Sequence, residues 1–343
     1  MGVDANDQLY PLAFAIVEKE NTETWSWFLA CIRCLVTQRT ELCIISDRHP
    51  GIMKAMSKES NGWEEPLAYH RFCIRHHASN INTKFKNRAL KDLFSWTAFQ
   101  HQPIKFNKGL AKINEFSVEA RAYLDKLPLS KWSMCHGGAL RYGIKTTNLA
   151  EVFNNVLKGA RFLPITALVK VTFYRVNSYF FQRRKFAKSR IFEGLKIFPV
   201  VTKYVENNFG KAAHHKVECY NSETGVYQVK TGRGQREAGK GGHTQTVNLS
   251  KRTCTNKFQI YHFPCSHVVA VCRTYNLTTD QFIDLFFTFG EYLGSYKPNF
   301  HPVPDERHWP NWVGEHVLPN NDLKREKGVL SPKGFAMRWT RDK

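Results

Sequence analysis

Apolar and polar positions near the N-terminus alternate between strand-like and helix-like patterns. Residues 9–17 form an apolar and aromatic run after a turn-like Asn6-Asp7, which predicts the second arm of a β-hairpin. Beyond a cap-like Asn21, apolar side chains recur at helical spacing over residues 25–36. These patterns predict a hairpin followed by an amphipathic helix.

A second strand-like run covers residues 42–45 and ends beside Asp47. His49-Pro50-Gly51 then breaks the chain, and a helix is expected to follow it. Strand, helix, strand and helix in this order favour an α/β fold, with Asp47 at the carboxyl end of a buried strand.

The rest of the chain divides into helical and strand-like parts. We expect helices over residues 80–135 and, with an interruption near Pro164, over about 148–190. We also expect strands over 217–229 and 247–263, and a short apolar helix over 266–275. After about residue 297 the chain is rich in Pro, Asn and Lys, which predicts little packed structure.

Composition adds the class of partner. The 343 residues are 42% hydrophobic, enough for a sizeable core and about two domains. The formal net charge of +21 favours a polyanionic partner: nucleic acid first, an acidic membrane surface second. No run approaches the ~18 apolar residues of a membrane span, and the N-terminus lacks the features of a signal peptide.

Nine cysteines are scattered along the chain and do not form the framework of a small disulfide-rich protein. We therefore expect reduced thiols in the cytosol or nucleus, some of them available to a metal. Cys31 and Cys34 form a Cys-x-x-Cys pair, but they lie within an apolar helical stripe, so packing is the favoured interpretation over zinc or redox chemistry.

Asp47 and Glu151 are the two acids singled out for catalysis. Carboxylates bind hard cations such as Mg²⁺ or Mn²⁺, and two such ions activate and stabilise the oxygens of a phosphodiester. On spacing alone, a helix cap at Asp47 and a surface position for Glu151 are the favoured alternatives.

Four motifs resemble the plant Mutator-like element (MULE, MuDR-type) transposases, in the order and spacing of that family. They are Gly2-Val3-Asp4-Ala5-Asn6-Asp7-Gln8-Leu9-Tyr10-Pro11-Leu12-Ala13-Phe14-Ala15, Ile45-Ser46-Asp47-Arg48-His49-Pro50-Gly51-Ile52, Cys73-Ile74-Arg75-His76-His77 and Asn148-Leu149-Ala150-Glu151-Val152-Phe153-Asn154-Asn155.

The resemblance implies an RNase H-like domain with a DDE triad and a helical insertion before the final Glu. It makes Asp47 the second triad acid and Glu151 the third, with Mg²⁺ or Mn²⁺ as the catalytic ions. It also matches Cys73 and His76 to a Cys-x-x-His element, whose two side chains share either a metal or a hydrogen-bond network. One Cys and one His are only half of a tetrahedral zinc shell.

The family's first acid lies on a strand before the hairpin, and this sequence contains no matching segment. Asp4 corresponds to a different family position, at the turn of the hairpin. Because two acids provide one bridging ligand fewer than three, we expect that this chain as written does not cleave or join DNA.

Residues 253–272 resemble a SWIM zinc finger, whose pattern is Cys-x-Cys, a spacer and Cys-x-His. Thiolates and imidazole are the ligands that Zn²⁺ prefers in tetrahedral sites. The matching residues are Cys254, Cys265 and His267, and one expected cysteine is missing. Either His262 or Cys272 is a candidate to complete the shell, although Cys272 lies on an apolar helix face.

No acidic residue occurs between Glu151 and Glu193, where cations and aromatic residues alternate. Such a segment is able to neutralise phosphates, while the alternative is a packed amphipathic helix with solvated charges. The candidate DNA-binding residues are Arg161, Lys170, Arg175, Arg183, Arg184, Lys185, Lys188 and Arg190.

Together these features predict three regions: an RNase H-like α/β domain over 1–195, a small α+β SWIM region over 200–285 with its core at 247–276, and a poorly ordered basic tail over 286–343. The expected protein is transposase-derived, nuclear and zinc-binding, with no membrane association and a possible homo-oligomeric state. Its DNA partner is either transposon terminal repeats or genomic DNA. A domesticated, non-catalytic DNA-binding or regulatory factor is the alternative function.

Overall fold

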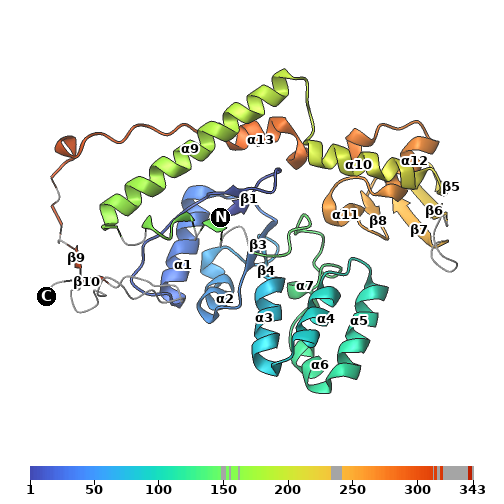
Figure 1. Cartoon of the computed structure of the whole chain (residues 1–343), viewed down its shortest axis with the longest axis horizontal. Coiled ribbons are helices and arrows are strands. Elements are labelled where there is room, and N and C mark those ends of the chain that lie inside the picture. The colour runs from blue at the N-terminus through green and yellow to red at the C-terminus, as the bar shows by residue number, and fades with distance from the viewer. Residues whose placement is uncertain are drawn as a thin grey trace.

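The computed structural model is a mixed α/β structure with several small sheets (Figure 1). The residues that it describes are 1–147, 152–153, 156–160, 163–232, 242–311, 313–314, 317–319 and 339–341. Glu151 and Arg161, two of the predicted site residues, lie outside them.

The N-terminal part contains two separate pairs of strands. β1 (Gly2–Val3) and β2 (Leu9–Tyr10) form an antiparallel hairpin, whereas β3 (Leu42–Ser46) and β4 (Ala68–Phe72) are parallel. Helix α1 (Thr22–Cys31) and a π-helical turn (Ile32–Val36) precede β3; α2 (Pro50–Met56) and a 3₁₀ turn (Glu59–Asn61) follow it.

Two predictions for this part need correction. The hairpin strand ends at Tyr10 instead of residue 17, because Gly2 already pairs with Tyr10 and β1 offers no further partner. The strand predicted to be buried, β3, is only half-buried along its whole length. The helix start was predicted correctly: the Asn21 side chain accepts a hydrogen bond from the Thr24 amide at 2.9 Å.

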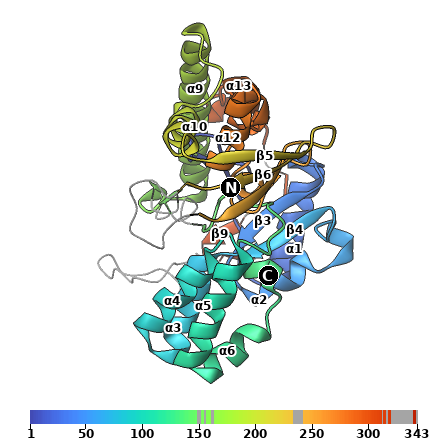
Figure 2. The same ribbon diagram turned by 90° about the vertical axis from the view of Figure 1, so that its right-hand side faces the viewer.

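A helical lobe follows β4 and extends away from the long helix α9 (Figures 1 and 2). Its core contains the fully buried Phe94, Phe106 and Trp132. The helices expected over residues 80–135 are therefore present. They are α3 (Ile74–Phe85), α4 (Arg88–Ala98), α5 (Pro103–Phe116), α6 (Val118–Asp125) and α7 (Leu129–Trp132).

The C-terminal half shares one hydrophobic core, which joins α9 to a four-stranded antiparallel sheet in the order β5-β6-β7-β8. Its elements are α9 (Ile165–Phe192), α10 (Pro199–Ala212), β5 (Lys216–Asn221), β6 (Val226–Lys230), β7 (Thr244–Asn248), β8 (Thr253–Cys254), α11 (Phe258–Tyr261), α12 (Ser266–Thr274) and α13 (Phe289–Ser295). Two short strands, β9 (Val317–Pro319) and β10 (Trp339–Arg341), pair near the C-terminus, and 3₁₀ turns cover Thr279–Phe282, Leu285–Phe287 and Glu306–His308.

The beginning of the predicted tail is in fact part of this core. Phe289, Tyr292 and Tyr296 are buried, and α13 packs against α9. The strand expected over residues 247–263 is also shorter than predicted, since α11 occupies its second half. No helix among the described residues combines the length and apolar character needed to cross a bilayer.

Candidate functional site

Cys254, Cys265 and His267 lie together between the sheet and α12. Cys254 ends the short strand β8, Cys265 is the N-cap of α12, and His267 lies in the first turn of that helix. All three residues are buried, and their ligand atoms lie within 4.8 Å of one another. The fold therefore brings together the three residues that the sequence pattern selected.

The distances within this triad suit a tetrahedral ion. His267 Nδ1 lies 3.7 Å from Cys254 Sγ and 3.6 Å from Cys265 Sγ. Zn–S bonds of about 2.3 Å and Zn–N bonds of about 2.0 Å at tetrahedral angles give S···N separations of roughly 3.6 Å. Three of the four positions of a zinc shell are consequently in place.

The two thiols interact with each other. A hydrogen bond from Cys254 and the nearby His267 hold the pKa of Cys265 well below its usual range despite burial. The same hydrogen bond, together with burial, raises the pKa of Cys254. The positive end of α12 also favours a thiolate at the N-cap position, so Cys265 is the anionic member of the pair.

The candidates for the missing ligand face elsewhere. His262 stacks on Tyr142 at 3.8 Å, and its Nε2 lies 3.0 Å from the Ala139 carbonyl oxygen. Cys272 is buried in the apolar core, where burial raises the pKa of its thiol to about 12. Neither side chain points into the triad.

A histidine that the sequence analysis missed, His215, lies against the triad. It stands just before β5, and its ring stacks on the His267 ring with centroids 5.2 Å apart. Burial lowers the pKa of His215, so the neutral imidazole is favoured. The only sequence signal was the His214-His215 pair, far upstream of the motif.

The second candidate site is the edge at which β3 and β4 end. Ser46 and Phe72 pair across the two strands, so Asp47 and Cys73 leave the sheet at the same edge. Asp47 is exposed, and its Oδ1 accepts a hydrogen bond from the His49 amide at 3.1 Å. Asp47 therefore closes the turn before α2 but does not cap the helix, because His49 is the N-cap and accepts a hydrogen bond from the Gly51 amide. The Asp47 carboxylate stays open to solvent.

Cys73 and His76 meet at Thr147, and within the described part of the chain they belong to no group of three metal-binding side chains. Thr147 donates hydrogen bonds to Cys73 Sγ at 3.4 Å from both its amide and its hydroxyl, and its Oγ1 lies 3.3 Å from His76 Nδ1. The Cys-x-x-His element therefore fixes the chain directly before residues 148–151, which include Glu151.

Comparisons with protein families identify both regions. Residues 1–80 match the MULE transposase domain, and residues 246–276 match the SWIM zinc finger. The chain carries a MULE transposase domain followed by a SWIM zinc finger. The comparisons with curated proteins and with solved structures found no match.

The predicted DNA-binding residues that follow the MULE domain have different environments. Lys185 and Lys188 are exposed on α9. Four other described cations contact their own chain. Arg175 donates a hydrogen bond to the Val156 carbonyl, and Arg184 donates one to the Asn299 side chain. Arg190 forms an ion pair with Glu193, and Lys170 lies over the Trp309 ring.

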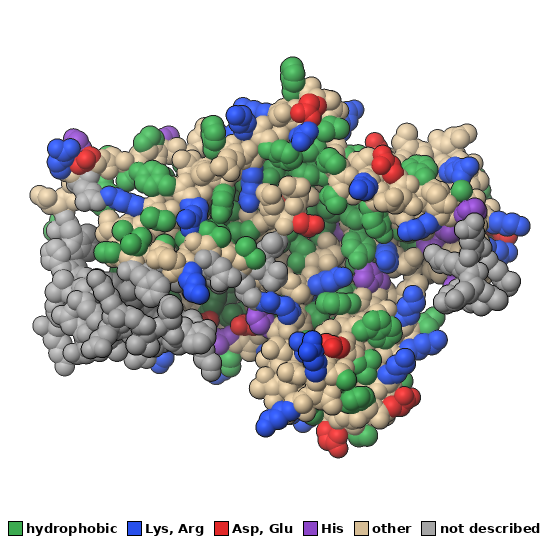
Figure 3. All heavy atoms as spheres, viewed as in Figure 1, with side chains coloured by type: hydrophobic (Ala, Val, Ile, Leu, Met, Phe, Trp, Pro, Cys, Tyr) green, Lys and Arg blue, Asp and Glu red, His purple; other side chains and the backbone are tan. Residues whose placement is uncertain are grey.

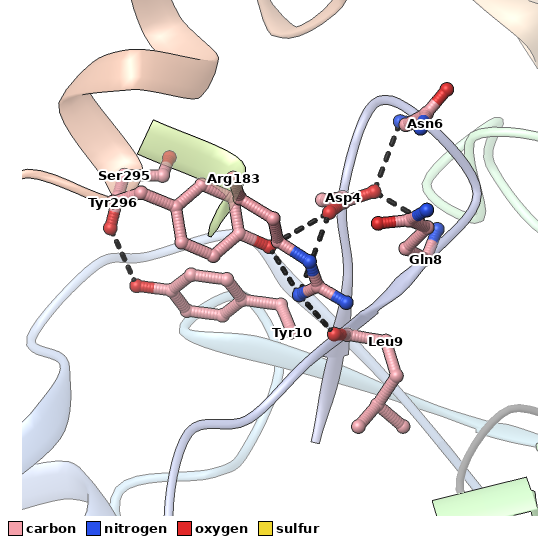
Figure 4. A network of polar contacts seen from close by, with 8 residues as sticks. All are labelled: Asp4, Asn6, Gln8, Leu9, Tyr10, Arg183, Ser295 and Tyr296. Atoms are coloured by element: carbon pink, nitrogen blue, oxygen red, sulfur yellow. Dashed lines mark hydrogen bonds and ion pairs between the residues drawn. The ribbon is translucent and has the colours of Figure 1, made fainter. Parts of the chain in front are cut away.

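Arg183 differs from the other cations because it points into the interior (Figure 4). Its Nη1 donates to the Leu9 carbonyl at 2.6 Å and to the Tyr296 hydroxyl at 2.7 Å, and lies 3.8 Å from Asp4 Oδ2. The side chain is only 13% exposed. Arg183 thus holds the MULE hairpin against α9 and α13 instead of presenting its charge to a phosphate.

Asp4 is the acceptor at the centre of this network. Its Oδ1 accepts hydrogen bonds from the amides of Asn6 and Gln8, and its Oδ2 accepts one from Tyr296 at 2.7 Å. Because both oxygens are engaged and the residue is 6% exposed, Asp4 has a structural role at the turn. We name Asp4, Arg183 and Tyr296 the hairpin clasp.

Proposed function

We propose that this Mutator-like transposase-derived chain binds zinc through its SWIM finger and binds DNA in the nucleus. The MULE and SWIM domains support the transposase origin and the zinc binding. Cys254, Cys265 and His267 hold the Zn²⁺, which acts as a structural cross-link between β8 and α12. An RNase H-like arrangement of the MULE domain, with Asp47 at the edge where β3 and β4 end, is part of the same proposal.

The observation that carries DNA binding is a group of lysines where the helical lobe meets the SWIM region. Lys105 belongs to α5, Lys145 follows α7, Lys211 lies in the last turn of α10, and Lys257 precedes α11. We name these four residues the junction lysine cluster. They come from four segments that are far apart in sequence.

Ring contacts fix the positions of two of these four lysines. The Lys145 ammonium lies 4.7 Å from the centroid of the Phe99 ring, and the Lys257 ammonium lies 6.0 Å from that of Tyr261. His101 stacks on Tyr261, and its Nε2 lies 2.9 Å from the Tyr261 hydroxyl. Aromatic faces beside lysines are typical of surfaces that bind nucleic acid.

The charges of the cluster repel one another. Burial lowers the pKa of Lys257, and the positive charges of Lys211, Lys105 and Lys145 lower it further. The Cys265 thiol opposes this shift, and no carboxylate of the described residues is among its causes. The negative charges of a phosphate backbone would remove this repulsion. The whole chain has 50 Lys and Arg against 29 Asp and Glu, and Lys and Arg also outnumber the acids on the face shown in Figure 3.

The DNA-binding prediction is tested by salt dependence. Replacing Lys105, Lys145 and Lys257 by Gln is expected to weaken binding to a labelled duplex. The slope of log K against log salt is expected to fall by about 0.9 for each phosphate that the variant no longer neutralises. Fluorescence anisotropy at a series of salt concentrations measures both.

The matched control is Lys108→Gln with Lys112→Gln, which removes exposed charge from α5 outside the cluster and is expected to leave most of the slope in place. Lys185→Gln with Lys188→Gln tests the surface of α9 in the same way. An unchanged slope in the Lys105, Lys145 and Lys257 variant would contradict the proposed interface.

We also propose that this chain by itself does not perform strand transfer. Asp4, the acid nearest in sequence to the place of the first triad acid, is held inside the hairpin clasp, where both of its carboxylate oxygens are engaged. The expected result is no Mg²⁺-dependent nicking of terminal-repeat DNA. Nicking by the wild-type chain that disappears in Asp47→Ala would overturn this part of the proposal, whereas DNA binding without nicking also fits the alternative of a domesticated regulatory factor.

A further inference from the structure

The zinc shell of this SWIM finger is one ligand short, and structural zinc sites are nearly always four-coordinate. The positions two residues on either side of Cys254 are Arg252 and Asn256, so neither supplies the second thiolate of the motif. Arg252 donates a hydrogen bond to the Gln281 carbonyl instead. The fourth ligand must therefore come from outside the motif.

His215 is the unused metal-binding side chain beside the triad. Its Nδ1 is buried, and no described residue offers it a hydrogen bond of good geometry. Its Nε2 makes one long contact, 3.3 Å from the hydroxyl of Ser266, the residue between Cys265 and His267. A buried nitrogen without a partner is costly, and a metal ion would satisfy it.

We propose that His215 supplies the fourth ligand and completes a Cys₂His₂ zinc site with Cys254, Cys265 and His267. This inference rests on the proposed zinc binding. It replaces the missing cysteine of the motif with a histidine from the segment between α10 and β5.

The side chain has to turn to reach the ion. The His215 and His267 rings are almost parallel, with an interplanar angle of 14°, and displaced parallel rings do not direct their lone pairs at one point. The backbone at this position is well placed, because Ala212 is buried in the core and Lys216 pairs with Lys230 in the sheet. Rotation of the side chain would give up the stacking on His267 and the long contact with Ser266.

The fourth ligand changes what the ion connects. With three ligands, zinc joins β8 to α12. With His215 as the fourth ligand it also binds the residue directly before β5, and β5 and β8 are the two edge strands of the sheet. The ion then fixes both ends of the module. This accounts for a zinc finger that persists although a motif cysteine is absent.

The test compares three full-length variants with the wild type after metal-free purification under reducing conditions. His215→Ala removes the ligand, His215→Cys replaces it with a thiol, and His214→Ala changes the exposed neighbour as a matched control. Zinc affinity is measured by competition with a chromogenic chelator. Bound Co²⁺ is examined by its absorption spectrum, and far-UV circular dichroism of the metal-free proteins checks folding.

His215→Ala is expected to bind zinc at least about tenfold more weakly, since the loss of even an outer partner of a ligand has an effect of that size. His214→Ala should match the wild type. His215→Cys should restore tight binding and add thiolate-to-cobalt charge-transfer absorption. Restoration of this kind would not follow if His215 only packed against His267.

The outcomes separate this inference from the proposed function. A wild-type chain that binds no zinc overturns both. Tight zinc binding by the wild type and equally tight binding by His215→Ala overturns the role of His215 alone. A His215→Cys cobalt spectrum identical to that of the wild type also contradicts direct ligation.

Discussion

Acidification from pH 7 to pH 5 is expected to lower the free energy of unfolding by on the order of 4 kcal/mol through His70 and His77 alone. His77 is fully buried among the rings of Phe94, Trp132 and their neighbours, and neither of its nitrogens has a hydrogen-bond partner among the described residues. Burial lowers its pKa to about 3. His70 is also buried, and burial followed by the charge of Lys131 lowers its pKa to about 4.

Acid lowers the stability because the unfolded chain takes up protons at a higher pH than the folded protein does. In the unfolded chain a histidine titrates near 6.5, whereas the folded protein keeps both rings neutral until pH 4 or below. The stabilising contribution is therefore complete above pH 6.5 and is lost as the pH falls towards 4 and then 3. At 1.36 kcal/mol per pH unit, each ring accounts for about 2 kcal/mol between pH 7 and pH 5.

Urea unfolding of the metal-free chain at pH 7 and pH 5, followed by far-UV circular dichroism, measures this effect. His77→Leu removes one titrating ring without leaving a polar atom in the core, so its loss of stability on acidification should be smaller by about 2 kcal/mol. His243→Leu, at an exposed position, is the matched control and should behave as the wild type does. The same pH dependence in His77→Leu and wild type would show that His77 does not carry the effect.

Local patterns were enough to predict much of the fold. The capping residue Asn21 and the apolar spacing after it mark α1, and the break at Pro164 precedes the start of α9. The grouping of Cys254, Cys265 and His267 was likewise predicted, because Cys265 and His267 form a short motif with an obvious chemistry. In these cases the residues that determine the structure are neighbours in sequence.

The failures have a different physical origin. Phe289, Tyr292 and Tyr296 repeat at helical spacing, but they directly precede the Pro-, Asn- and Lys-rich segment and were assigned to the same tail, so the helix that packs against α9 was missed. Arg183 was indistinguishable by charge from the exposed lysines of α9, because its partner Asp4 is far away in the sequence. His215 lacked any local motif. Each of these roles depends on a contact that sequence spacing does not encode.

The hairpin clasp leads to the second large effect: Asp4→Ala is expected to destabilise the folded chain by about 3–5 kcal/mol, the usual cost of removing one partner of a buried ion pair. The substitution leaves the Arg183 guanidinium and the Tyr296 hydroxyl without their carboxylate, in an interior where Tyr296 is fully buried. It also removes the acceptor of the turn amides of Asn6 and Gln8. The hairpin would then lose its attachment to α9 and α13.

Urea unfolding at pH 7 gives the size of this effect, and a double-mutant cycle gives its cause. Arg183→Met removes the charge that Asp4→Ala leaves unpaired, so the double variant should be less destabilised than the sum of the two single variants. Asp7→Asn, at an exposed turn position with φ of 53°, makes the same charge change outside the clasp and should stay within about 0.5 kcal/mol of the wild type. Strictly additive effects of Asp4→Ala and Arg183→Met would refute the pairing. A reduced salt slope of DNA binding in Arg183→Met, with the fold intact, would instead return Arg183 to the DNA-binding surface that its charge first suggested.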